Sequence, residues 1–249
     1  MSRHPLSAVL ARLIWLCIAP LLLLAVWLAW SHLRELDARQ LREAGAFAHN
    51  YATANDRYLD ARLKALNMLA LSPLADDPRR WPELYREAQG LQQSFGTHVI
   101  FADDQGQMLF NTRQPYGAPL PPLPTSKGRS AAPLALQTGK PQVGDIVVGP
   151  VTQVPSVGIV VPVLREGQPT RLLLATIDNA FFQERLDQLA LPEGWSIALR
   201  DGTGTDIARR ALAGVDRVRD ADDEHRIVVR SDLAAWSVAL DVPDGAAAG

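Results

Sequence analysis

The hydrophobic pattern of this chain changes abruptly after residue 30. Residues 13–30 read LIWLCIAPLLLLAVWLAW and contain no charged side chain. A run of about 18 to 20 apolar residues is long enough to cross a bilayer as a helix. The tryptophans that close the run suit a membrane interface better than a signal-peptidase site. The pattern therefore predicts a retained transmembrane helix at 13–30, preceded by a short tail at 1–12.

A second pattern, with apolar and small residues at steps of three and four, follows the run and is typical of one face of a helix. This stripe consists of Leu41, Ala44, Ala48, Tyr51, Asn55 and Tyr58. Residues 31–72 are therefore predicted to form a long stalk helix that ends before Pro73. Two interpretations of the stripe remain open. It pairs with a second copy as a coiled coil, which would make the chain a homodimer, or it packs on the chain's own domain, and the two interpretations can hold together.

Beyond residue 73 the periodicity alternates between helix and strand. Helices are expected at 78–91, 131–138 and 178–189, and strands at 98–102, 107–111, 142–148, 157–164 and 171–177. A smaller unit follows, with strands expected at 195–200, 206–209, 226–230 and 236–242 and an exposed acidic loop or a short helix at 216–224. This order predicts an α+β fold in which helices back a five-stranded antiparallel sheet, followed by a smaller second lobe.

Composition narrows the classes of function. The 249 residues carry a net charge of -2, which argues against a nucleic-acid partner because such proteins usually present a strongly basic face. The single cysteine, Cys17, lies inside the apolar run, so the rest of the chain suits an oxidising compartment. The Lys and Arg residues flanking the run do not decide its orientation.

Several segments, in this order, resemble the double-Cache, PAS-like periplasmic sensor domains of bacterial transmembrane receptors. They are HVIFADDQGQMLFNT, LQTGKPQVGDIVVGPV, VGIVVPVLREGQPTRLLLATIDNAFF, GWSIALRDGTGTDIARR and the closing WSVALDVP. The resemblance covers about residues 33–242. It implies a membrane-distal lobe at 73–190, a smaller membrane-proximal lobe at 191–243, and a tail at 244–249 that leads to a second span in a longer parent. It also implies an inner-membrane anchor with a cytoplasmic tail at 1–12 and the bulk of the chain in the periplasm.

The function implied by the resemblance is ligand sensing in a signal-transduction receptor. A sensor histidine kinase is the expected parent, with a diguanylate cyclase or a chemoreceptor as the alternatives, and its output module would lie beyond Gly249. An anchored periplasmic binding or scaffold protein and a tethered enzyme are the competing hypotheses. The sequence offers no catalytic constellation and no metal-ligand spacing, and no cofactor is expected.

The same resemblance places the ligand between the sheet of the distal lobe and the long loop at 113–129. Arg113 would hold a carboxylate bidentately, Asp178 would hold an ammonium group, and Tyr116 would cover the apolar part of a small ligand such as an amino acid. In the alternative interpretation Arg113 is solvated, Tyr116 packs on the loop, and Asp178 caps the helix that begins at Asn179.

Overall fold

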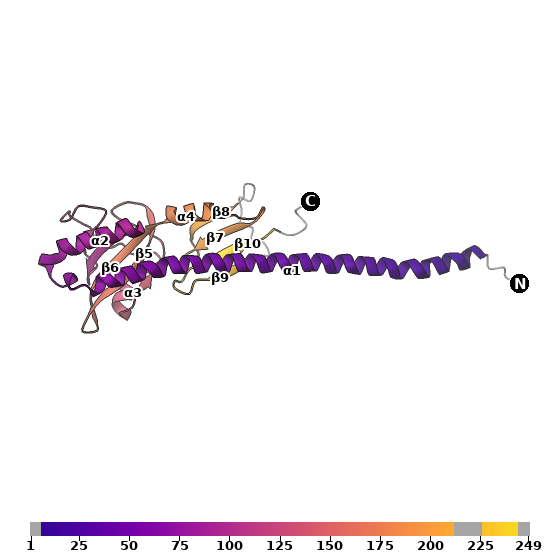
Figure 1. Ribbon diagram of the computed structural model, residues 1–249, viewed down its shortest axis with the longest axis horizontal. Helices are drawn as coiled ribbons and strands as arrows, with labels where there is room; N and C mark the ends of the chain where they lie inside the picture. Colours follow the sequence, from indigo (N-terminus) through magenta and orange to yellow (C-terminus); the bar gives the residue numbers. More distant parts are fainter. Residues whose placement is uncertain (1–5, 212–225, 244–249) are drawn as a thin grey trace.

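A single helix runs the length of the molecule and joins the predicted span to the predicted stalk without a break (Figure 1). This helix, α1 (Leu6–Leu71), has 66 residues and contains Pro20. The computed structural model describes residues 6–211 and 226–243. The acidic loop predicted at 216–224, the first residues of the tail at 1–12 and the tail at 244–249 lie outside the described residues.

Among the described residues, no helix combines the length and the apolar character that crossing a membrane requires. The transmembrane helix at 13–30 stays a prediction.

The first lobe is a six-stranded antiparallel sheet with helices on both faces. Its strands are β1 (His98–Asp103), β2 (Met108–Asn111), β3 (Gln142–Val143), β4 (Val147–Val148), β5 (Pro155–Arg165) and β6 (Gln168–Asp178). They lie in the order β2-β1-β6-β5-β3, and β4 also pairs with β5. The short 3₁₀ helices Pro73–Ala75 and Pro78–Arg80 lead from α1 to α2 (Trp81–Phe95). Helices α1 and α2 pack on one face of the sheet, and α3 (Ala131–Thr138) packs on the other.

The second lobe is a four-stranded antiparallel sheet. It consists of β7 (Ser196–Arg200), β8 (Asp206–Ala211), β9 (Arg226–Arg230) and β10 (Ser237–Asp241), in the order β8-β7-β10-β9. Helix α4 (Asn179–Asp187) follows β6 directly and packs on β8. The second lobe lies beside the middle of α1, between the first lobe and the N-terminal part of the helix (Figure 1). The α+β class and the antiparallel sheets are confirmed. The expectation of five strands in the first sheet is wrong, since the sheet has six.

One predicted strand is wrong. The segment 142–148 does not form one strand but two strands of two residues, β3 and β4, which both pair with β5. Between them, residues 144–146 leave the sheet. The N–H of Ile146 and the carbonyl of Gly144 bond with the second lobe instead, whereas the N–H of Asp145 donates to the carbonyl of Arg129 in the first lobe. These long-range contacts override the local strand pattern.

Strict alternation along the central strands of the first sheet gives it two apolar faces, since successive side chains of a strand point to opposite sides. On β1, Val99 and Phe101 belong to the core beneath α1 and α2, whereas Ile100 and Ala102 belong to a second cluster beneath α3. Strand β6 repeats the pattern. Both faces are therefore buried, and whatever binds on the α3 side must do so within that second cluster.

The stripe along α1 is buried against the chain's own lobes. Ala44 and Ala48 are 0% exposed, and Tyr51 and Asn55 are also buried, in a core that draws residues from both sheets. The interpretation in which this face packs on its own domain is therefore the one that the structure supports. Side chains already buried within one chain cannot pair with the same side chains of a second copy.

Replacing Ala48 with glutamate places a carboxylate in this core, and we expect the free energy of unfolding to fall by about 3 kcal/mol or more because a buried charge has no partner there. Ala46, two residues away and exposed, provides the matched control, and Ala46→Glu should leave thermal unfolding followed by circular dichroism nearly unchanged. Equal unfolding temperatures for the two variants would contradict the burial of this face.

Candidate ligand-binding pocket

A pocket lies on the α3 side of the first sheet. Its walls come from β1, β5 and β6, from residues 123–132 around the start of α3, and from residues 144–152 between β3 and β5. Much of its lining is apolar and includes Ile100, Met108, Leu123, Val151, Val160 and Leu174. The pocket is partly open to solvent, and its volume of about 80 Å³ is several times the roughly 10–15 Å³ that one water molecule requires. The pocket therefore has room for a small ligand.

Arg113 is one of the charged groups that line this pocket. Its backbone N–H donates to Asn111 Oδ1 (3.0 Å), which fixes the turn that follows β2. Its guanidinium Nη2 donates to Asp178 Oδ1 at 2.6 Å, and the two side chains are 18% and 34% exposed. A charge-assisted bond at this distance is among the stronger contacts a protein makes. The structure thus brings together two of the three residues predicted to bind ligand.

Asp178 ends β6, at the point where α4 begins. It occupies the N-cap position of α4, yet its side chain makes no capping hydrogen bond with the helix. Its register partner across the sheet is Ser156, which lines the pocket. The carboxylate of Asp178 therefore pairs with Arg113 at the edge of the pocket. It does not cap α4, which was the alternative considered from the sequence.

Tyr116 lies elsewhere on the long loop. It is 40% exposed, and its ring contacts that of Tyr85 on α2 edge to face, with 5.5 Å between centroids. The hydroxyl of Tyr85 donates to the carbonyl of Gln114 at 2.8 Å and holds this part of the loop on α2. Tyr116 is not among the residues that line the pocket.

Sequence reasoning missed polar residues on the pocket face of the sheet. His98 pairs with Thr176 across β1 and β6, two residues before Ile100, so it shares the face of Ile100 and Leu174. The alternation of β1 and β6 was the signal that could have found them. Burial lowers the pKa of His98, the positive charge of Arg113 lowers it further, and Asp178 acts in the opposite direction. His98 therefore favours its neutral form in the folded chain.

Two further charged residues line the pocket at its other end. Arg129 lies just before α3, and its guanidinium donates to Gln142 Oε1 at 2.9 Å. Asp145 is only 4% exposed, and both of its oxygens accept backbone N–H groups. Asp145 therefore has little capacity left to bind a ligand directly. Within the described residues, no three His, Cys, Asp or Glu side chains are grouped as metal ligands would be.

Comparison with solved structures identifies the fold. The chain is similar to the ligand-binding domain of the Pseudomonas aeruginosa PAO1 amino-acid chemoreceptor PctB in complex with L-Arg (TM-score 0.60, 16% identity, 85% of this chain and 97% of that one). It is also similar to the ligand-binding domain of the Pseudomonas fluorescens chemoreceptor CtaA in complex with L-isoleucine (TM-score 0.60, 11% identity, 86% of this chain and 97% of that one). A third similar structure is the extracellular domain of rpHK1S-Z16, which is assigned as a histidine kinase (TM-score 0.60, 14% identity, 85% of this chain and 98% of that one).

The Cache-type, PAS-like fold expected from the sequence is thereby confirmed, since these neighbours are two ligand-binding domains of chemoreceptors and one extracellular domain of an assigned histidine kinase. Identities of this size establish the fold alone. No family model matches the sequence. No curated protein matches it either.

The environment of His98 predicts a pH dependence of stability. Its pKa is lowered in the folded chain from an unfolded value near 6.5, so the unfolded chain binds the proton more readily and stability falls as pH drops below about 6.5. Between pH 7.5 and 5.5 we expect His98→Gln to lose less thermal stability than the wild type.

The control for this experiment is His49→Gln, which removes an exposed histidine from α1 and should keep the wild-type slope of unfolding temperature against pH. A His98→Gln variant whose slope matches the wild type would refute the assignment.

Proposed function

We propose that this chain is the extracytoplasmic ligand-binding region of a bacterial membrane receptor, and that its pocket takes a small molecule with both a carboxylate and an ammonium group. The observation that carries the proposal is the ion pair of Arg113 and Asp178 at the edge of a largely apolar pocket. The Cache-type fold, in which PctB binds L-Arg and CtaA binds L-isoleucine, supports it.

The ion pair determines which ligands would be favoured. A simple carboxylate that took Arg113 from Asp178 would leave the aspartate without its partner, and breaking a partly buried pair in this way is costly. An amino acid avoids that cost because its carboxylate can bind the guanidinium while its ammonium group binds Asp178. The apolar wall formed by Ile100, Val160 and Leu174 would then favour an aliphatic side chain.

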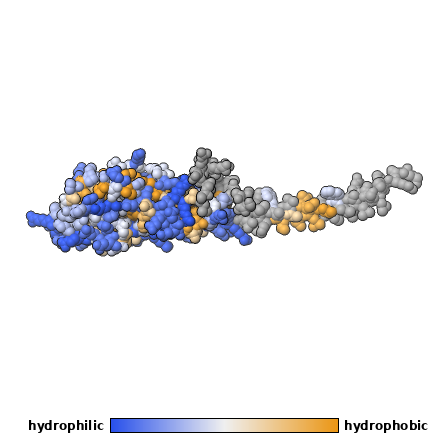
Figure 2. Space-filling view, turned by 90° about the horizontal axis from the view of Figure 1, so that it is seen from above, coloured by the Kyte–Doolittle hydropathy of each residue, from blue (hydrophilic) through white to orange (hydrophobic). Residues whose placement is uncertain are grey.

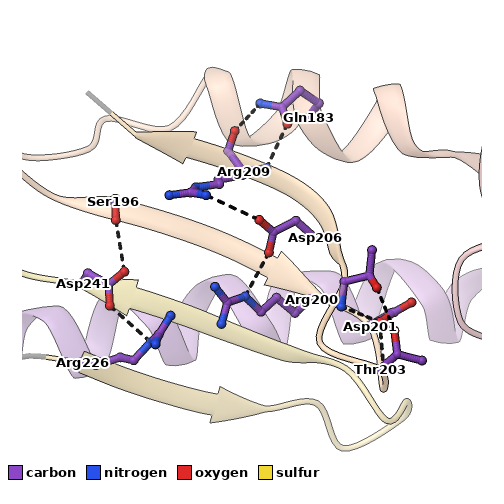
Figure 3. Close-up of polar contacts among 10 residues, drawn as sticks. Gln183, Ser196, Arg200, Asp201, Thr203, Asp206, Arg209, Arg226 and Asp241 are labelled. Carbon is purple, nitrogen blue, oxygen red and sulfur yellow. Dashed lines mark hydrogen bonds and ion pairs between the residues drawn. The ribbon is translucent and has the colours of Figure 1, made fainter. Parts of the chain in front are cut away.

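Titration calorimetry of the full chain with the twenty standard L-amino acids tests this proposal. We expect binding by at least one aliphatic amino acid. Arg113→Gln and Asp178→Asn should each weaken that binding by roughly tenfold or more, the effect of losing a hydrogen bond to a charged group. The matched control is Asp206→Asn, which breaks a similar ion pair with Arg200 (2.9 Å) in the second lobe (Figure 3).

The proposal fails if none of the twenty amino acids binds, or if Asp206→Asn weakens binding as much as Asp178→Asn does. Tight binding of acetate or propionate, with no preference for amino acids, would contradict the role given to Asp178.

We also propose that residues 13–30 anchor the chain in the inner membrane, with the tail at 1–12 in the cytoplasm and both lobes in the periplasm. On the part of α1 that extends beyond the lobes, several described apolar side chains are more than half exposed, namely Leu21, Leu22, Leu23, Leu24, Trp27 and Leu28. The same region is orange in Figure 2. A contiguous apolar surface of this kind indicates contact with lipid or protein.

Membrane fractionation checks the anchor. The wild-type chain should remain in the membrane pellet after alkaline carbonate extraction. Leu23→Arg combined with Leu24→Arg should move much of it to the soluble fraction, because each arginine near the centre of a span costs about 2.5 to 3.5 kcal/mol on insertion scales. Ala46→Arg, outside the span, is the control. Extraction of the wild-type chain by carbonate would refute the anchor.

The parent protein that we propose is a sensor histidine kinase, with a diguanylate cyclase or a chemoreceptor as alternatives. We propose that the stalk helix spans residues 31–72, the membrane-distal lobe residues 73–190 and the membrane-proximal lobe residues 191–243. A homodimer through the stalk would have to use the exposed face of α1, which carries Ala46, Ala61 and Met68, because the opposite face is buried.

A further inference from the structure

The two lobes are joined by hydrogen bonds between residues 144–146 and two turns of the second lobe. Asp145 Oδ1 accepts the backbone N–H of Gly202 (2.8 Å). In the reverse direction, Asp201 Oδ2 accepts the backbone N–H of Ile146 (3.2 Å). The indole Nε1 of the buried Trp236 donates to the carbonyl of Gly144 (3.1 Å). These contacts are called the interlobe junction below.

Each carboxylate of the junction also binds its own lobe. Asp145 Oδ2 accepts the backbone N–H of Arg129 (2.6 Å), at the start of α3. Asp201 Oδ1 accepts the hydroxyl of Thr203 and the backbone N–H groups of Thr203 and Thr205 (2.7 to 2.9 Å), and Figure 3 shows Asp201 and Thr203 in contact. Both aspartates are 4% exposed. Because losing a donor from a buried carboxylate is costly, a shift of one lobe at this point would strain the bonds that the same carboxylate makes in the other lobe.

Close packing at two glycines strengthens the constraint. A methyl group on Gly202 would lie 2.9 Å from Asp145 Oδ1 and 3.0 Å from the Cβ of Ala235. A methyl group on Gly128 would overlap both Thr203 Cγ2 and Asp145 Oδ2. The loop before α3, the carboxylate of Asp145 and the turn of the second lobe are therefore packed closely against one another.

The residues on the first-lobe side of the junction are also a wall of the pocket. Arg129, Ser130, Gly144 and Asp145 all line it. A molecule that occupies the pocket and displaces this wall therefore displaces the donors and acceptors that hold the second lobe.

We propose that Asp145 is a positioning residue that communicates occupancy of the pocket to the β7–β8 turn of the second lobe. The ligand in this inference rests on the proposed function, whereas the mechanical coupling of the two lobes does not. Coupling between two sites is reciprocal. A change in the second-lobe turn, which does not line the pocket, should therefore alter the pocket wall and the affinity for a pocket ligand.

Amide hydrogen exchange of the full chain in detergent micelles tests the coupling without a ligand. We expect Asp145→Asn to accelerate exchange in residues 201–205 at least tenfold. Gly202→Ala, which adds only the methyl group described above, should accelerate exchange in residues 126–132. The pair tests the two directions separately, and Gly202→Ala decides the matter if Asp145→Asn does not fold.

Matched controls lie within the first lobe. Asp103 Oδ1 accepts the backbone N–H groups of Gln105 and Gln107 (3.0 and 2.8 Å) in the β1–β2 turn, so Asp103→Asn removes an aspartate of the same local type away from the junction. Gly90→Ala adds a methyl group where nothing lies within 4 Å. Both should change exchange only in their own segments. The coupling is refuted if Asp145→Asn leaves exchange in residues 201–205 unchanged and Gly202→Ala leaves exchange in residues 126–132 unchanged.

A second measurement concerns occupancy. Ala132→Phe fills the pocket from α3, since Ala132 lines it, and should change exchange in residues 201–205. For whichever of the twenty amino acids binds, Gly202→Ala should change the dissociation constant at least threefold and Asp103→Asn should not. If no amino acid binds, the proposed function fails, while the exchange experiments still decide the coupling. Unchanged exchange in 201–205 on filling the pocket would overturn the inference.

Discussion

Burial of one face of α1 beneath both sheets is the constraint on which the rest of the structure depends. The helix, both lobes and α4 contribute to one hydrophobic core. Tyr58 on α1 stacks on Phe181 of α4 at 4.6 Å between centroids, and the neighbouring Phe182 contacts Trp236 at 5.7 Å. Neither lobe can separate from the helix without exposing this core to water. The cost of that exposure keeps α1 packed along both lobes.

Charged groups within this core are held by backbone and aromatic partners. The buried Arg62 donates to the carbonyl of Phe95 at 2.7 Å and lies 3.2 Å from the centroid of the Tyr58 ring. Burial raises the pKa of Tyr58 to about 12, so its ring stays neutral and stabilises the guanidinium as a cation–π partner. The carboxylate of Asp56 accepts the hydroxyl of Ser231 and thereby fixes α1 to the β9–β10 turn. The helix thus holds both lobes through polar as well as apolar contacts.

Local periodicity was sufficient to predict the helices and nearly all the strands, because each has one or two faces buried in a regular way. It failed at 142–148, where the residues between β3 and β4 give up sheet pairing for contacts with the second lobe that are more than 50 residues away in sequence. The 3.6-residue period of α1 showed that one face of the helix is buried. It did not show whether the chain's own lobes or a second copy of the chain buries it. Likewise, residue type suggested that Arg113 and Asp178 bind charges, whereas their contact with each other depends on the β-sheet register.

The positions of the two polar ends of the pocket limit how a ligand could act. Asp178 is followed directly by α4, which packs on the second lobe, and Asp145 contacts that lobe through Gly202. A ligand shifts a conformational equilibrium only by its difference in affinity for the two states. A ligand that merely replaced the partner of Arg113 would leave the junction unchanged and could act only through α4. A ligand that also displaced the wall at Asp145 would act on the second lobe at two places, through α4 and through the contact with Gly202.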